Sequence, residues 1–237
     1  MPRVTLFAGP SAYGVPRSVL FEARVDLRPP VRRGEVDALI AEATESGVVV
    51  ICDGVFQSEP AVSHGEILRA IDAGWQVWGV SSIGAIRAFE LREEGMKGFG
   101  YVRGQFDRFE DFTDDEMCLL HSPQEPYFPL SEALINVRFV LERWRHALPL
   151  SVRQERRILE TLRALWFGDR TEETIRHAIV DRGVDASRVD ALLNWLSQNR
   201  IKTIDLLALM SRQPWLDNVS SATRSRVRRR PRALLRP

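Results

Sequence analysis

Short segments that are apolar throughout alternate with amphipathic segments over the first 91 residues, and this alternation constrains the fold more than any other sequence feature. Residues 4–8, 48–52 and 75–80 are continuously apolar, as strands buried on both faces are. Residues 34–46 and 62–73 carry apolar side chains at helical spacing, and a glycine follows each segment. We therefore expect an α/β protein with a mostly parallel sheet flanked by helices, a Rossmann-like three-layer core.

Weaker patterns extend this core. Residues 23–27 and 117–121 are predicted as further strands, and residues 83–91 as a helix. The glycine-rich stretch 96–104 is predicted as a loop and a turn. A long helix with an apolar stripe is expected over 130–148.

From residue 150 onward the sequence has helical patterns only. The helices predicted here span residues 151–167, 171–180, 186–199 and 204–210. We therefore expect an α/β core over 1–149, an all-helical C-terminal appendage over 150–216 and a disordered, arginine-rich tail over 217–237. The appendage is expected to dock on or cover the core. The tail either contacts an acidic partner or RNA, or serves as an unstructured solubility tail.

Composition argues against several classes of protein. With 44% hydrophobic and 27% charged residues the chain can form a globular core, and its net charge of +1 gives no reason to expect nucleic acid as a partner. No apolar run approaches the roughly 20 residues of a membrane span, and the N-terminal residues lack a signal-peptide pattern. The two cysteines, Cys52 and Cys118, lack metal-ligand spacing. We expect a reduced, cytoplasmic protein without a metal site or membrane association.

Residues 75–91 are the most informative stretch, because a predicted strand turns directly into a predicted helix there. Ser81 and Ser82 lie at the corner, and the small residues Gly84 and Ala85 follow. Such a corner presents backbone N–H groups and the positive end of a helix dipole to an anion, and it exposes a serine oxygen as a nucleophile elbow does. Alternatively, Ser82 only caps the helix, since serine is a preferred N-cap residue.

Polar residues also follow the other predicted strands. Ser11, Arg28 and Asp53 come at or just after the ends of three strands, and His121 ends another. In parallel sheets ligands bind outside the carboxyl ends of the strands. Together with Ser82, these residues predict a functional site at that edge of the sheet, independently of any family.

A set of motifs between residues 4 and 148 is specific in combination, although each motif is weak alone. The motifs are Gly9-Pro10-Ser11, Asp53-Gly54, His64 with Glu66, Ser82-Ile83-Gly84-Ala85-Ile86-Arg87, Glu90, Asp114-Asp115-Glu116, His121, and Tyr127 to Arg138. Their order and spacing resemble the TfuA family. The predicted helical appendage lies outside this resemblance.

TfuA-like proteins accompany YcaO enzymes, which activate a peptide amide with ATP. Together they are associated with replacing a backbone amide oxygen by sulfur in ribosomally made peptides. The resemblance therefore implies a YcaO protein as partner, a sulfur-carrier protein ending in a thiocarboxylate as sulfur source, and a precursor peptide as a further candidate contact. It implies no cofactor on this chain, since ATP belongs to the YcaO partner.

Release of sulfide from a thiocarboxylate is an acyl transfer, which needs a nucleophile and an oxyanion site. The resemblance makes Ser82 the expected nucleophile, with N–H groups of the first helical turn as the oxyanion site. His64 is then a candidate general base that Asp53 or Glu66 orients. His121 is a second candidate base.

The remaining candidates are binding residues. Arg87 is expected to hold the carboxylate of the carrier or a sulfide-derived anion, unless it only forms a helix ion pair with Glu90. The other binding candidates are Ser81, Gly84, Gly9 and Ser11. For His64 the alternative is a hydrogen-bonded structural histidine, and for Asp53 the alternative is a simple turn with Gly54.

Two other functions compete with a sulfur-releasing hydrolase. In one, the chain binds YcaO and shapes its site without chemistry of its own. In the other, Cys52, which stands where the resemblance leads us to expect an aliphatic residue, carries sulfur as a persulfide. We expect the hydrolase, with Ser82 as its nucleophile.

Overall fold

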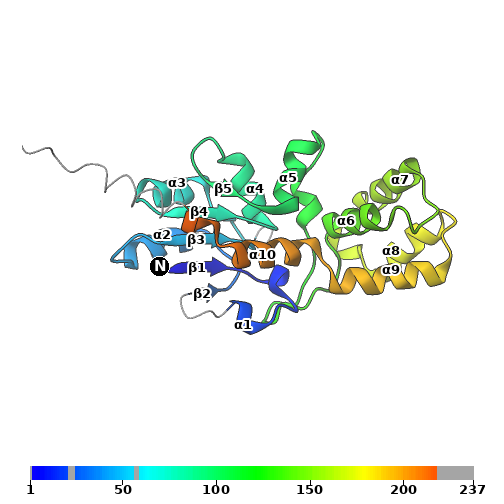
Figure 1. The fold of residues 1–237 in the computed structure, drawn as a ribbon, viewed down its shortest axis with the longest axis horizontal. Helices are drawn as coiled ribbons and strands as arrows, with labels where there is room; N and C mark the ends of the chain where they lie inside the picture. Colours follow the sequence, from blue (N-terminus) through cyan, green and yellow to red (C-terminus); the bar gives the residue numbers. More distant parts are fainter. Residues whose placement is uncertain (1, 21–24, 56–58, 218–237) are drawn as a thin grey trace, which may run out of the picture.

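A five-stranded sheet forms the centre of the protein in the computed structural model, which describes residues 2–20, 25–55 and 59–217 (Figure 1). The strand order is β2-β1-β3-β4-β5, and every neighbouring pair is parallel. The strands are β1 (Val4–Phe7), β2 (Val25–Arg28), β3 (Val48–Ile51), β4 (Gln76–Gly79) and β5 (Lys97–Gly98). The predicted α/β class with a parallel sheet flanked by helices is confirmed.

Ten helices are found in the described ranges. They are α1 (Arg17–Leu20), α2 (Glu35–Glu42), α3 (His64–Asp72), α4 (Ile83–Glu90), α5 (Gly100–Arg108), α6 (Leu134–Trp144), α7 (Val152–Arg163), α8 (Glu172–Val180), α9 (Ala186–Gln198) and α10 (Ile201–Arg212). Short 3₁₀ turns are η1 (Pro10–Ala12), η2 (Asp114–Met117), η3 (Phe167–Asp169) and η4 (Pro214–Leu216). Within the ranges described, no helix has the length and hydropathy needed to cross a membrane.

Helices cover both faces of the sheet, as continuously apolar strands require. On one face α2, α3, α4 and α5 pack against side chains that include Phe7, Val49 and Ile51. On the other face the apolar side chains of α1, α10 and η4 pack against Leu6 and Trp78. Helix α10, at the C-terminal end of the described chain, therefore supplies most of the third layer, and Figure 1 shows it running back along the sheet.

Packing does not follow the predicted boundary at residue 149. Helix α6, which precedes that boundary, shares an apolar cluster with α7, α8 and α9 at one end of the molecule (Figure 1). Helix α10, which follows it, belongs to the sheet layer. The division into a core over 1–149 and an appendage over 150–216 stays a prediction. Of the predicted tail over 217–237, all but Asp217 lies outside the described residues.

The stretch 96–104 differs from its prediction as a loop, because it contains β5 and the start of α5. The carboxylate of Asp205 accepts hydrogen bonds from Tyr101 N and Val102 N, both at 2.9 Å, and so caps α5 from α10. Burial outweighs these two bonds and raises the pKa of Asp205 to about 6. A cap that comes from a residue 104 positions away leaves no local sequence pattern.

The predicted strand at 117–121 is also wrong. This segment follows η2 and makes one isolated bridge, between His121 and Pro129. Its backbone bonds instead to the loop ahead of α6: Leu120 N donates to Ser131 Oγ, and Leu120 O accepts from Leu130 N. An apolar run of this length can satisfy its backbone in a loop as well as in a sheet.

Two glycines let the first turn of α4 lie directly on the backbone of the sheet. A Cβ atom on Gly84 would overlap the carbonyl oxygen of Ile51 in β3, and one on Gly79 would overlap the carbonyl oxygen of Gly84. This close approach therefore requires glycine at both positions. It fixes Ser82, the N-cap residue of α4, immediately beyond the end of β4.

We predict that Gly84→Ala destabilises the protein by about 3 kcal/mol or more, because the added methyl group must displace α4 from β3. Gly104→Ala in α5 is the matched control: no atom lies within 4 Å of its added Cβ. This control should stabilise the protein by about 0.5–1 kcal/mol. Urea unfolding measures both values, and similar stabilities of the two variants would refute the close-packing argument.

Candidate functional site

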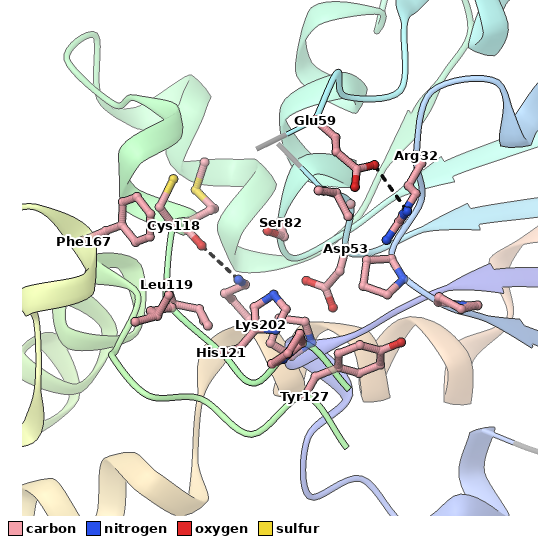
Figure 2. A pocket seen from close by; sticks show the side chains of 18 residues that line it. Arg32, Asp53, Glu59, Ser82, Cys118, Leu119, His121, Tyr127, Phe167 and Lys202 are labelled. Atoms are coloured by element: carbon pink, nitrogen blue, oxygen red, sulfur yellow. Dashed lines mark hydrogen bonds and ion pairs between the residues drawn. The ribbon is translucent and has the colours of Figure 1, made fainter. Parts of the chain in front are cut away.

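A pocket of about 620 Å³ opens at the carboxyl ends of β1, β3 and β4 (Figure 2). The loops after these strands contribute Pro10, Asp53 and Ser82. The opposite wall comes from residues 117–121, which hold His121, and from the start of α10, which supplies Lys202. The pocket thus lies where ligands bind in parallel α/β proteins.

The wall at 117–121 is held in place by buried ion pairs. Glu116 is completely buried, and its carboxylate accepts hydrogen bonds from Arg138 at 2.5 and 3.2 Å and from Arg163 at 2.5 Å. The neighbouring Asp115 pairs with the buried Arg170. Removal of one partner of such a pair leaves an uncompensated buried charge, so this network strongly favours one position of the loop.

Asp53 ties the loop after β3 to the loop after β1. Its Oδ2 accepts from Gly9 N at 2.8 Å and Ser11 N at 2.9 Å, and its Oδ1 accepts from Ser11 Oγ at 2.7 Å. The side chain is almost fully buried. Two predicted binding residues, Gly9 and Ser11, therefore contact Asp53. Asp53 positions two loops of the pocket, and none of these bonds orients a histidine.

Ser82 lies at the N-cap position of α4 and is 3% exposed. Its side chain accepts no capping hydrogen bond. In the described part of the chain its hydroxyl has no hydrogen-bond partner, although it lines the pocket. A hydroxyl on a pocket wall without a protein partner is open to solvent or to a ligand. The arrangement therefore favours a site residue over a simple cap.

The backbone on either side of Ser82 is arranged as a tight corner. Ser81 has a φ of 65°, in the left-handed region that non-glycine residues rarely adopt, and its Oγ donates to Lys202 O at 2.6 Å. Beyond Ser82, the amides of Ala85 and Ile86 bond back to Ser82 O. The Ile83 amide has no backbone acceptor within the described ranges, so it is the free donor at the start of the helix.

His121, the second predicted base, lines the pocket. Its Nδ1 lies 2.7 Å from Ser122 O. A carbonyl oxygen can only accept, so Nδ1 carries the proton of this bond, and in the neutral ring Nε2 is then the acceptor. The free lone pair of a neutral His121 is therefore on Nε2, the nitrogen that could accept a proton.

His64, the first predicted base, lies outside the pocket. It starts α3, its side chain is 50% exposed, and its Nε2 lies 2.7 Å from Glu90 Oε2. Arg87 Nη1 donates to the same carboxylate oxygen at 2.5 Å. Burial opposes the ionisation of Glu90, but hydrogen bonds from His64 and Arg87 outweigh it and lower its pKa. Three predicted site residues thus form a separate surface cluster, apart from Ser82 and Asp53.

The other predicted residues have local structural contacts. Glu66 completes a capping box with Ser63 at the start of α3 and orients no histidine. Gly84 packs on the carbonyl of Ile51 and does not line the pocket. Arg28, at the end of β2, donates to Asp26 at 3.0 Å.

Lys202 is a buried, charged pocket residue that sequence analysis missed. It is 2% exposed, and its Nζ donates to Met117 O at 3.0 Å. The residue precedes the helix predicted over 204–210 and lies outside the predicted motifs. One signal was available: the chain contains 31 arginines and two lysines, Lys97 and Lys202. A lysine in an amphipathic helix of so arginine-rich a chain is a candidate for a specific role.

Both cysteines are buried, and their thiols are held in the neutral form. Burial, with the charge of Asp53 adding to it, raises the pKa of Cys52 well above its usual range. Burial likewise raises the pKa of Cys118, which lines the pocket, to about 11. Since the thiolate is the reactive form, neither environment favours sulfur transfer through cysteine.

The fold and the pocket define a class of protein: a parallel α/β protein with a buried serine, carboxylate and lysine at a strand-end site. Across the described ranges, no group of histidine, cysteine and carboxylate side chains could hold a metal ion. A sequence model of TfuA-like proteins matches residues 53–171, half of the chain, and the chain therefore belongs to the TfuA-like family. At the level of the family, this membership supports a role in the YcaO-associated thioamide pathway. No curated protein matches the sequence.

The contacts of Ser82 predict a small effect of its removal on stability. We expect Ser82→Ala to change the free energy of unfolding by less than about 0.5 kcal/mol, since the hydroxyl makes no cap. Ser63→Ala is the matched control, because Ser63 caps α3 through Glu66 N. The control should lose about 1 kcal/mol in urea unfolding. An equal loss in both variants would identify Ser82 as a structural cap.

The thiol environments predict slow alkylation. At pH 7 a thiol with a pKa near 11 is ionised in roughly one molecule in ten thousand. We therefore expect both cysteines of the native protein to react with a water-soluble thiol reagent at least about a hundredfold more slowly than in urea. Rapid native labelling that Cys52→Ser abolishes would contradict this and support a persulfide carrier.

Proposed function

We propose that this TfuA-like protein acts in the cytoplasm and delivers sulfur to a YcaO partner for backbone thioamidation of a ribosomally synthesised peptide. Its own reaction is hydrolysis of the thiocarboxylate at the end of a sulfur-carrier protein, which releases sulfide. The observation that carries the proposal is the Ser82 hydroxyl, which lines the pocket at the start of α4 and caps nothing. His121 and Lys202 line the same pocket.

In the first step the Ser82 oxygen attacks the carbonyl carbon of the thiocarboxylate. Its proton passes to Nε2 of His121, the ring nitrogen left as acceptor by the bond to Ser122 O. The negative oxygen of the tetrahedral intermediate is stabilised by the Ile83 amide and the helix dipole behind it. His121 returns the proton to sulfur, the C–S bond breaks, and hydrosulfide leaves.

In the second step water attacks the ester formed on Ser82. His121 takes a proton from the water and returns it to the serine oxygen as the C–O bond breaks. The products are the carrier carboxylate and free Ser82, so the balance is one water consumed and one hydrosulfide and one proton released. Asp53 acts as a positioning residue, because its three hydrogen bonds hold the loop after β1.

A second candidate function is that of a YcaO partner without chemistry of its own. The observation that favours it is a group of exposed apolar side chains beside the pocket, namely Leu120, Phe128 and Leu130. Leu120 lines the pocket, and Leu130 N bonds to its carbonyl. Exposed apolar side chains of this kind are common at protein interfaces.

We predict that purified protein releases sulfide from a thiocarboxylated carrier protein in the absence of YcaO. Ser82→Ala should reduce this release at least about a hundredfold, to the level without protein, because the nucleophile is lost. His64→Gln is the control, since His64 does not line the pocket, and it should keep nearly full activity.

Sulfide electrodes or methylene-blue assays measure the release. Equal release by wild type and Ser82→Ala would exclude the serine mechanism. No release by wild type, together with a rise in YcaO activity on contact when free sulfide is supplied, would support the second candidate.

A further inference from the structure

Lys202 places a positive charge inside the pocket. It is the second residue of α10, is 2% exposed, and uses one of its three N–H donors on Met117 O. Figure 2 shows its side chain beside His121, with a dashed line from the amine to the carbonyl of Met117 in the wall that also carries Cys118. Two donors of this ammonium group are therefore left for another acceptor.

Among the residues that the structure describes, this ammonium group has no paired carboxylate. Over the described ranges, no carboxylate oxygen lies within 4 Å of Nζ. Asp53 directs its oxygens to three donors of the loop after β1. Two other charged residues of the pocket lining, Arg32 and Glu59, form an ion pair with each other, with 3.3 Å between Arg32 Nη1 and Glu59 Oε2. Burial of an unpaired ion costs several kcal/mol, so a lysine here is expected to meet an anion when the pocket is filled.

The main chain of Lys202 is fixed relative to the serine corner. Its carbonyl accepts from Ser81 Oγ at 2.6 Å, and its N–H donates to Asn136 Oδ1 at 3.3 Å. Both partners are buried. The bond to Ser81 joins the lysine directly to the residue before Ser82. This bond therefore fixes the main chain of Lys202 relative to that of Ser82, the candidate nucleophile.

We infer that Lys202 binds the anionic end of the substrate and thereby selects a chain that terminates in a free carboxylate-type group. The identity of that group as a thiocarboxylate rests on the proposed function. An amide or ester end can accept a hydrogen bond, but it carries no charge and cannot neutralise the ammonium group. The other cation of the lining, Arg32, is paired with Glu59, and much of the remaining wall is apolar, so recognition of the charge falls to Lys202.

The scarcity of lysine allows a direct test. Protein labelled with [¹³Cε]lysine gives two lysine signals, and Lys97→Met assigns them. Lys97 lies near Trp78 and Gln76, outside the pocket lining, so it is an internal control. The probes are N-acetyl-Gly-Gly with a free carboxylate and the same peptide with a carboxamide end.

We expect the acid peptide to shift the Lys202 signal and leave the Lys97 signal unchanged. The amide peptide, and Lys202→Met with the acid peptide, should bind at least about tenfold more weakly, because a charged hydrogen bond is lost. Lys97→Met should bind as wild type does. Equal binding of the two peptides, no binding of the acid peptide at 10 mM (about −3 kcal/mol), or an unmoved Lys202 signal at saturation would overturn the inference.

The outcomes separate this inference from the proposed function. Lys202-dependent binding of the acid peptide without any sulfide release would retain the anion site and refute the hydrolase. Sulfide release by Lys202→Met with the KM of wild type would retain the hydrolase and refute the anion site. The labelled wild-type protein decides the question if Lys202→Met does not fold.

Discussion

The sheet of this protein has two apolar faces, and the helices that connect its strands cover chiefly one of them. The face that contains Leu6, Val50 and Trp78 is covered by α10 and Trp215, together with the four-residue helix α1. Burial of apolar side chains is the dominant favourable term in folding, so the α/β core depends on a helix that follows the α7–α9 bundle in sequence. The chain passes through that bundle and returns to complete its own core.

The same helix joins the core to the chemistry of the pocket. Asp205 caps α5, and Lys202 lies one turn earlier on α10, bonded to the serine corner. Docking of α10 therefore buries the apolar face and sets the electrostatics of the pocket in a single event. Stability and function are coupled through one element, and a substitution on its apolar side is expected to affect both.

Local patterns in the sequence were sufficient for strands β1 to β4 and for the serine corner, but they missed the two-residue strand β5 and predicted a strand at 117–121 that is absent from the sheet. Continuous apolar runs and flanking glycines are properties of neighbouring residues, and Ser82 and Asp53 follow from the rule that strand ends converge. The separation of His64 from the pocket was not predictable, because it depends on which face of α3 turns toward Glu90. Lys202 and the cap at Asp205 depend on contacts between residues about a hundred positions apart, which helical periodicity does not record.

The position of α10 near the end of the described chain has a consequence for synthesis on the ribosome. A nascent chain that has emerged only as far as residue 200 has one sheet face without its main covering helix and lacks Lys202. Such an intermediate exposes apolar surface, which favours aggregation and binding by chaperones. The order of translation thus delays maturation until α10 docks, and a polypeptide that stalls earlier acquires neither a finished core nor the buried lysine of the pocket.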